Sequence, residues 1–109
     1  MAKTLAPKLA VTLDDGQEYT IQTDNRDMVR FDITRGRMKW PTMKDAPMLW
    51  VTFLAWSCLH REGKLGANVE KELDRILGVD VLDEDGNPVD LDDPDVMDAM
   101  SVDPTGLTT

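Results

Sequence analysis

The sequence has little of the side-chain chemistry on which enzymes depend. Its 109 residues include one cysteine, Cys58, and one histidine, His60. A lone cysteine excludes an intrachain disulfide and favours a reducing compartment. The sequence also lacks a nucleophile elbow, a phosphate-binding glycine loop and a dinucleotide fingerprint. We therefore predict no catalytic residues, no cofactor and no bound metal, and interpret the chain as a binding protein rather than an enzyme.

We do not expect Cys58 and His60 to form a pair of nucleophile and general base. They stand two residues apart in a segment predicted to be helical, and such residues point to different sides of a helix. We expect Cys58 to pack in the core, because a free cysteine behaves as a small hydrophobe. His60 is followed by Arg61 and Glu62, so we expect it at the surface or at the helix end.

Apolar runs long enough to cross a membrane are lacking. The run from Ala46 to Leu59 is shorter than the roughly 20 residues that a bilayer needs. Residues 1–8 have neither the apolar core nor the cleavage site of a signal peptide. We therefore expect no membrane partner and no export.

Basic residues are lacking from the last third of the chain. All twelve lysines and arginines lie between Lys3 and Arg75, where eleven acids nearly balance them, whereas residues 76–109 contain ten acids and no base. Such a segment repels nucleic acid and anionic membranes and attracts basic partners. Its simplest role is to keep the protein soluble. The net charge of -9 therefore belongs to the C-terminal segment.

Three arginines, Arg26, Arg30 and Arg37, share one edge of a predicted helix. They raise the question of nucleic-acid binding, but no aromatic residues are interleaved with them and the body carries almost no net charge. We interpret this edge as a solvated face, with pairing to the acidic segment as an alternative. No nucleic-acid partner is predicted.

Alternation of apolar and polar residues predicts a β-hairpin near the N-terminus. A three-residue loop pairs Val11 with Tyr19 and Leu9 with Ile21. It also places Gly16 at the left-handed position that follows a type I turn. An isolated hairpin is marginal in water, so its apolar face must pack against a helix or another strand.

The next element is a helix over residues 25–40, with Asp24 as its N-cap and Pro41 after its end. It has two apolar stripes on nearly opposite sides. We favour a position between the hairpin and the next helix over a position at an interface. One stripe contains Val29, Ile33 and Trp40, with Gly36 permitting close approach, and the other contains Met28, Phe31 and Met38.

A second helix begins near Asp45, has Pro47 in its first turn and ends at Gly63. It is apolar on all sides and contains Trp50 and Trp56, which is typical of a central core helix or of one that meets another subunit. One hairpin and two helices are expected to leave part of it uncovered. This favours self-association or partner binding.

The C-terminal part is predicted to contain a third helix over residues 67–77 and a second hairpin. In this hairpin, Val79 and Val81 pair with Leu91 and Val89 around an acid-acid-glycine turn. The turn resembles part of a calcium loop, but Val81 stands where the first carboxylate ligand is required. We therefore prefer the hairpin.

These elements predict an α+β fold that is mainly helical, with an N-terminal β-hairpin packed on about three helices, a second short hairpin and an acidic C-terminal tail. Residues 1–92 are predicted to form one compact domain with its core in residues 8–78. Residues 93–109 are predicted to be an acidic, flexible tail, with folding against a partner as the alternative.

Two segments around the first two helices have a distinctive sequence. Residues 14–41 read DDGQEYTIQTDNRDMVRFDITRGRMKWP, and residues 45–63 read DAPMLWVTFLAWSCLHREG. Their most specific parts are the stretch Thr23–Met28 and the Asp45-Ala46-Pro47 entry to the Trp-rich helix. These segments, about half of the chain, resemble the tail assembly chaperones of long-tailed bacteriophages, particularly those of actinobacterial hosts.

The resemblance implies a non-enzymatic factor of the infected bacterial cytoplasm, which binds the tape measure protein while the tail tube polymerises and is absent from the mature virion. Families of this kind usually make a longer form as well, by ribosomal frameshifting. Residues 64–109 match the family only in being variable and acidic.

The resemblance also implies that the tape measure protein is long and largely helical. Methionine and aromatic side chains suit an amphipathic helix because they adapt their shape. We predict a partner-binding surface for this helix, or for another copy of the chain, formed by Met28, Phe31, Met38, Trp50 and Trp56. Two other functions stay open, namely an acidic decoy that mimics nucleic acid and a structural joining or tail component of the virion.

Overall fold

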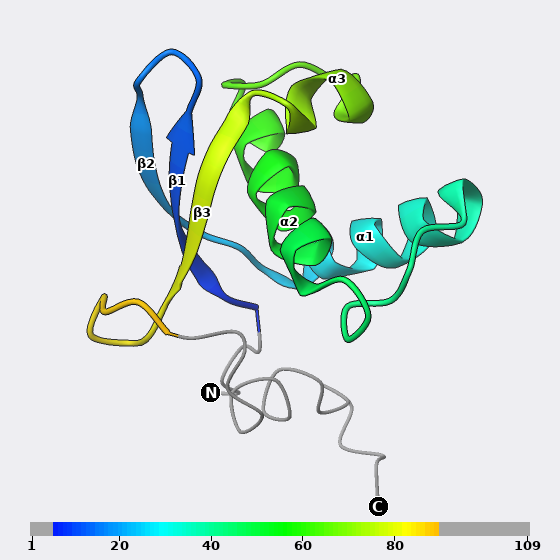
Figure 1. Ribbon diagram of the computed structural model, residues 1–109, viewed down its shortest axis with the longest axis horizontal. Coiled ribbons are helices and arrows are strands. Elements are labelled where there is room, and N and C mark those ends of the chain that lie inside the picture. The colour runs from blue at the N-terminus through cyan, green and yellow to red at the C-terminus, as the bar shows by residue number, and fades with distance from the viewer. Residues whose placement is uncertain (1–5, 90–109) are drawn as a thin grey trace, which may run out of the picture.

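The structure of the protein is a computed structural model that describes residues 6–89. Three antiparallel strands form a sheet in the order β2-β1-β3, and three helices lie on one side of it (Figure 1). The fold is therefore α+β, as predicted, and the helices hold more residues than the strands. The elements are β1 (Lys8–Leu13), β2 (Glu18–Gln22), α1 (Asn25–Met38), α2 (Pro47–Arg61), α3 (Val69–Leu73) and β3 (Ile76–Leu82).

The β1–β2 hairpin has the predicted register. Leu9 pairs with Ile21 and Val11 pairs with Tyr19. Gly16 has a φ of 87°, and its N–H donates to the Leu13 carbonyl in the three-residue loop. The prediction from alternation and turn chemistry is confirmed here, because this loop length alone puts all four apolar side chains on the face that meets the helices.

The third helix is shorter than predicted, because Ile76 and Leu77 belong to a strand. α3 ends at Leu73, and β3 pairs with β1 so that Val79 lies opposite Val11. The prediction was wrong because helical spacing of apolar residues was read without the tertiary contact. Arg75 ties the chain to the first hairpin: its carbonyl accepts from the Asp14 N–H, and its side chain pairs with the Asp14 carboxylate at 3.3 Å.

The second hairpin exists as far as the structure describes it. The Val89 N–H donates to the Val81 carbonyl, Leu82 bridges to Pro88, and Gly86 has a φ of 85° at the turn. These contacts agree with the predicted pairing of Val81 with Val89. Leu91, the proposed flexible tail at 93–109 and the C-terminal boundary of the domain at residue 92 lie outside the described residues.

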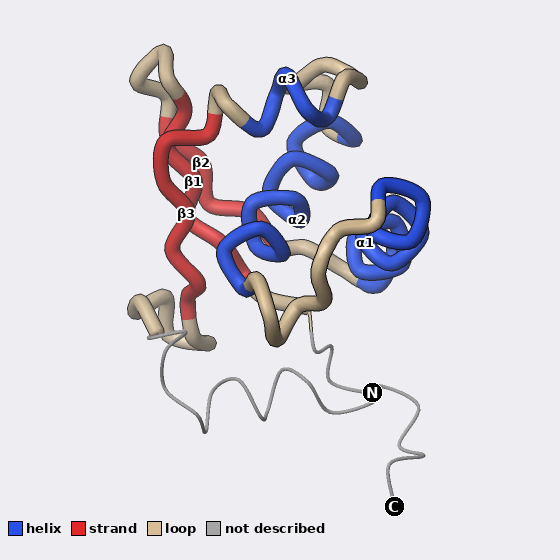
Figure 2. The backbone as a smooth tube through the Cα atoms, turned by 45° about the vertical axis from the view of Figure 1, so that its right-hand side comes forward, coloured by secondary structure: helices blue, strands red, loops and turns tan. Residues whose placement is uncertain are grey.

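The central helix is α2, which lies between the sheet and α1 (Figure 2). From Trp50 to Leu59 every residue except Thr52 is buried. The expectation that α1 is sandwiched between hairpin and helix was therefore wrong, as was the expectation that α2 keeps an uncovered side. β3, which widens the sheet, and α3 both contact α2 and cover the side that the prediction left exposed. The buried apolar side chains are Ala6, Leu9, Val11, Leu13, Ile21, Phe31, Trp50, Val51, Phe53, Leu54, Ala55, Trp56, Cys58, Leu59, Leu65 and Val81.

No helix within residues 6–89 is long and apolar enough to cross a membrane.

Candidate functional site: a groove along the first helix

The five residues predicted to bind a partner lie mostly in the core. Phe31 is 2% exposed and packs edge-on against Phe53, with 5.5 Å between ring centroids. Trp50 and Trp56 are also buried, and Met28 is half-buried, as is Met38. The prediction that these side chains form an exposed surface was wrong, and their part in partner binding stays a prediction.

A buried polar cluster explains why Phe31 faces inward. Asp27 is fully buried, and its carboxylate accepts a hydrogen bond of 2.6 Å from the Ser57 hydroxyl and pairs with the Arg61 guanidinium, both on α2. Phe31 follows Asp27 by four residues and so lies on the same face of α1. The rotation that brings Asp27 to α2 therefore places Phe31 in the core and turns the opposite stripe, Val29 and Ile33, toward solvent.

The same cluster forms the N-terminus of α1. The Asp24 carboxylate accepts the Arg26 N–H, and the Asp27 carboxylate accepts the Asp24 N–H at 3.0 Å, which completes a capping box. The stretch Thr23–Met28, the most distinctive part of the sequence, thus has a structural role. It starts α1 and fixes its rotation against α2.

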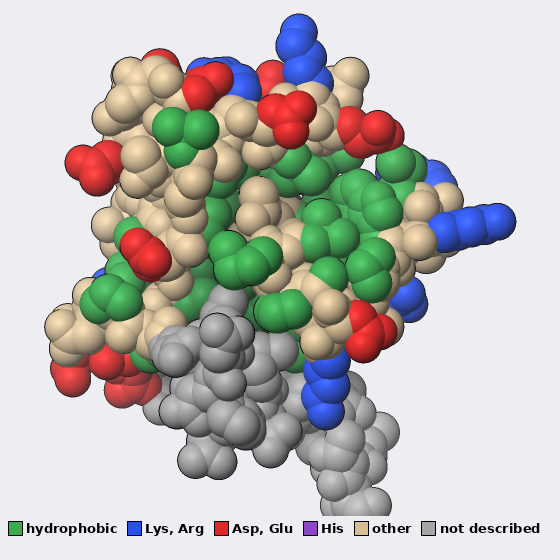
Figure 3. Space-filling view, in the orientation of Figure 1, with side chains coloured by type: hydrophobic (Ala, Val, Ile, Leu, Met, Phe, Trp, Pro, Cys, Tyr) green, Lys and Arg blue, Asp and Glu red, His purple; other side chains and the backbone are tan. Residues whose placement is uncertain are grey.

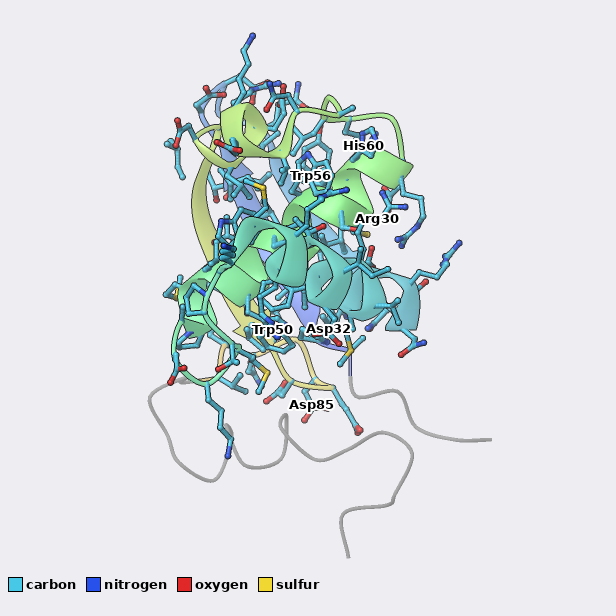
Figure 4. The ribbon with its side chains drawn as sticks, turned by 90° about the vertical axis from the view of Figure 1, so that its right-hand side faces the viewer. Arg30, Asp32, Trp50, Trp56, His60 and Asp85 are labelled. Carbon is cyan, nitrogen blue, oxygen red and sulfur yellow. The ribbon has the colours of Figure 1, made fainter. Side chains whose placement is uncertain are left out.

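The outward stripe of α1 lines a groove. Val29 is 45% exposed and Ile33 is 63% exposed, the latter among the most exposed large apolar residues of the described chain. The opposite wall comes from Trp56 on α2, Ala67 in the segment that joins α2 to α3, and Val69 at the start of α3. The groove has a volume of about 550 Å³ and opens to solvent; it is lined by Asn25, Arg26, Val29, Arg30, Ile33, Thr34, Arg37, Trp56, Ala67 and Val69. Figure 4 views the molecule from the side on which α1 lies, with Arg30 and Trp56 labelled.

Trp56 holds the wall of the groove in place. Its indole N–H donates to the Gly66 carbonyl at 2.9 Å, and the His60 ring stacks on it with 5.1 Å between centroids. The His60 Nδ1 in turn lies 3.0 Å from the Leu65 carbonyl oxygen. His60 is thus at the helix end, as predicted. Its ring, Trp56 and the loop form one packed unit, which gives the groove a preformed wall.

The charge of the groove is positive, although the chain as a whole is strongly acidic. Arg26 pairs with Asp24 at 2.7 Å. Within residues 6–89 no carboxylate lies at ion-pair distance from Arg30 or Arg37, and no acid lines the groove. The predicted arginine edge is therefore the rim of an apolar groove, a juxtaposition that charge counting alone did not indicate.

Two other apolar side chains are exposed away from the groove. Met48 on α2 is half exposed, and Leu77 on β3 is 68% exposed. Apolar side chains also gather over the helical half of the face seen in Figure 3. The groove combines a concave apolar surface with two arginines that have no carboxylate at ion-pair distance within residues 6–89, so we take it as the candidate site.

Two titratable side chains outside the groove, those of Asp83 and Cys58, have partners within the fold. The Asp83 carboxylate accepts the N–H groups of Asp85 and Asn87, each at 2.9 Å, and so closes the second hairpin turn. In the described part of the chain no group of three metal-ligating side chains comes together. Burial and a hydrogen bond with Glu62 raise the pKa of the Cys58 thiol to about 12, which removes its nucleophilic thiolate form at neutral pH.

Comparison with known proteins adds no relative. No family model, no curated protein and no solved structure matches the chain.

Proposed function

We propose that the protein is a non-enzymatic tail assembly chaperone of a long-tailed bacteriophage, which binds the tape measure protein in the host cytoplasm and leaves before the virion matures. The class of partner comes from the resemblance of residues 14–41 and 45–63 to such chaperones. The observation that carries the binding role is the exposure of Val29 and Ile33 in a groove with a preformed wall. A helix laid into an apolar groove is a recurring mode of peptide recognition.

Co-purification from bacteria tests this function. The tagged full-length chain, expressed with the tape measure protein of the phage that encodes it, is expected to hold that protein in a soluble complex. The matched control is the major tail tube protein of the same phage, which is expected to stay in the flow-through. Absence of any complex with full-length or fragmented tape measure protein contradicts the proposal.

A structural virion component is the first alternative. Mass spectrometry of purified particles separates the two, because a chaperone is expected to be absent from them. The chain in stoichiometric amounts in mature particles would support the structural role instead.

An acidic decoy is the second alternative. A truncation that removes β3 does not test it, because β3 pairs with β1 in the sheet. The informative variant is the full-length chain in which carboxylates of the C-terminal segment become amides. A decoy should lose much of its partner binding in this variant, because half of the ten acids in residues 76–109 become neutral. A chaperone that uses the groove should keep nearly all of its binding. The changed positions are Asp90, Asp92, Asp93, Asp95 and Asp98.

A further inference from the structure

We propose that the groove along α1 takes one amphipathic helix whose apolar stripe is flanked by aspartate or glutamate, so that carboxylates of the partner pair with Arg30 and Arg37. The chemistry follows from the groove itself, and only the assignment of this helix to a tape measure protein rests on the proposed function. Length, lining and charge of the groove support the inference separately.

The length of the groove suits a helix. Its α1 wall runs from Asn25 to Arg37, and the twelve residue steps between them rise by about 18 Å along the helix. A partner helix of about three turns covers this length. Such a helix presents apolar side chains at intervals of three and four residues, which is the spacing of Val29 and Ile33 on the wall that it meets.

The lining of the groove is aliphatic where it is exposed. Ile33 and Val29 leave about half of their residue surface open to solvent, and Val69 continues the apolar lining on the opposite wall. Burying such surface is the main favourable contribution to helix docking. Single-stranded nucleic acids are instead held by exposed aromatic faces, and Trp56 is buried beneath His60. The lining therefore favours a peptide.

The rim selects for acid. Arg30 lies about one helical turn before Ile33, and Arg37 lies about one turn after it. Neither guanidinium group forms an ion pair with a carboxylate of the described residues. A guanidinium group binds a carboxylate through two parallel hydrogen bonds. The two arginines therefore favour binding of a helix with acidic residues beside its apolar stripe and disfavour binding of one with basic residues there.

A second copy of the chain is not expected to pair with the first through the same groove on both copies, because the charges of the two grooves are alike. In a two-fold symmetric contact each surface meets itself, so the arginines of one copy would face those of the other. Like charges across an interface disfavour the contact. The occupant is therefore a different, acidic helix.

Two synthetic peptides of identical length and apolar content test the chemistry. Both are alanine-based 18-mers with leucine at intervals of four and three residues; one has glutamate beside the stripe, and the other has lysine at the same positions. Binding to the full-length protein is followed by fluorescence anisotropy. We expect the glutamate peptide to bind at least about tenfold more tightly than the lysine peptide, and to weaken as salt is raised. Equal affinities, or tighter binding of the lysine peptide, would overturn the proposal.

The isoleucines locate the peptide. The chain has three, and they lie in different settings: Ile21 is buried in the core, Ile76 is half-buried on β3, and Ile33 lies in the groove. With only the isoleucine δ-methyl groups labelled for NMR, the glutamate peptide should shift the Ile33 signal and leave that of Ile21 in place. A shift of Ile76 alone would place the peptide elsewhere and overturn the proposal.

Substitutions at exposed positions complete the test. Ile33→Ser should weaken the glutamate peptide about tenfold, while Leu77→Ser, at an equally exposed position outside the groove, should not. Arg30→Glu with Arg37→Glu should reverse the preference to the lysine peptide, while Lys44→Glu should leave it unchanged. Ile33→Ser and the double arginine variant test the apolar and the charged parts of the groove separately. If one variant does not fold, the other still tests the proposal.

Other occupants give distinct results. The Ile33 signal of the amide variant described above, without peptide, should match that of the unaltered chain; a shift would assign the groove to the chain's own acidic segment and overturn the proposal. A DNA oligonucleotide that displaces the glutamate peptide would overturn it as well. If the tape measure complex survives both Ile33→Ser and the double arginine variant, this inference fails while the proposed function stands. If the peptides behave as expected but no tape measure complex forms, the proposed function fails and the inference stands.

Discussion

The Ser57 hydroxyl donates a hydrogen bond of 2.6 Å to the Asp27 carboxylate, and both side chains are buried where the first turn of α1 meets α2. The same carboxylate oxygen accepts from the Arg61 guanidinium, and the other oxygen accepts the Asp24 N–H. One side chain thus caps a helix, fixes its rotation and joins it to the central helix. This contact decides which stripe of α1 faces the groove.

Removing the carboxylate is expected to destabilise the fold. Asp27→Ala leaves the buried Ser57 hydroxyl without its acceptor and leaves the Arg61 guanidinium with only the Asp24 carboxylate, 3.6 Å away. We expect a loss of about 3 kcal/mol of unfolding free energy. Urea denaturation followed by tryptophan fluorescence measures this change. The matched control is Asp32→Ala, an exposed position on the same helix, which is expected to change stability by less than about 0.5 kcal/mol. A loss of the same size in both variants would show that the cluster has no special role.

Ser57→Ala tests the hydrogen bond alone. It removes one bond to a charged acceptor that keeps its other partners, and is expected to cost about 1.5 kcal/mol. Combined with Asp27→Ala, the loss should be smaller than the sum of the single losses, because the two residues share one contact. Additive losses would contradict a direct interaction between them.

Stability is expected to fall in acid through Asp24. Hydrogen bonds from the Arg26 side chain hold the pKa of this carboxyl at about 2, below the usual 3.8. A lowered pKa stabilises the folded state above the unfolded-state value, and the contribution disappears as the pH falls from about 4 to about 2. Since the Asp24 side chain is 38% exposed, we expect screening to reduce the effect to about 1 kcal/mol at most.

Comparison with Asp24→Asn isolates this contribution, because asparagine keeps the N-cap and loses the charge. The difference in unfolding free energy between the two proteins should be constant above about pH 5 and shrink toward pH 2. A difference that does not depend on pH would contradict the ion pair with Arg26.

Cys58 is expected to react slowly with thiol reagents. Burial raises the pKa of its thiol to about 12, so little thiolate is present at pH 8, and the side chain has no access to solvent. Labelling with a chromogenic disulfide should be about 100-fold slower in the native protein than in urea. The variant Leu77→Cys supplies the control, since its added thiol lies at an exposed position and should react at once. Fast labelling of two thiols in that variant would contradict the burial of Cys58.

Local patterns in the sequence predicted the hairpins and the first two helices well. The Val11 and Tyr19 pairing, the left-handed Gly16 and the N-cap at Asp24 each depend on residues close in sequence, where turn and cap chemistry decide the conformation. The end of α3 was predicted wrongly, because Ile76 is drawn into a strand by pairing with Leu13, more than sixty residues away. No local pattern contains that contact.

The candidate site was harder to predict, because α1 has two apolar stripes and either of them could have packed in the core. Hydrophobicity does not distinguish the stripe of Phe31 from that of Ile33. The deciding feature is polar: Asp27 lies on the Phe31 side and finds Ser57 and Arg61 on another helix. An acid three residues after an N-cap signals a capping box in the sequence, but its second role in the core depends on the tertiary fold.

Gly16 and Gly36 have open surroundings, so substitutions there measure the effect of backbone conformation without a change in packing. An added Cβ would meet nothing within 4 Å at either Gly16 or Gly36, so the expected close approach at Gly36 does not occur within the described chain. Gly16 has a left-handed φ of 87°, and Gly16→Ala should cost about 1 kcal/mol because alanine avoids that region. Gly36 lies inside α1, so Gly36→Ala should stabilise the protein by about 0.5 to 1 kcal/mol. Urea midpoints of the two variants measure both effects. Shifts of the same sign would contradict either the left-handed turn or the helical position.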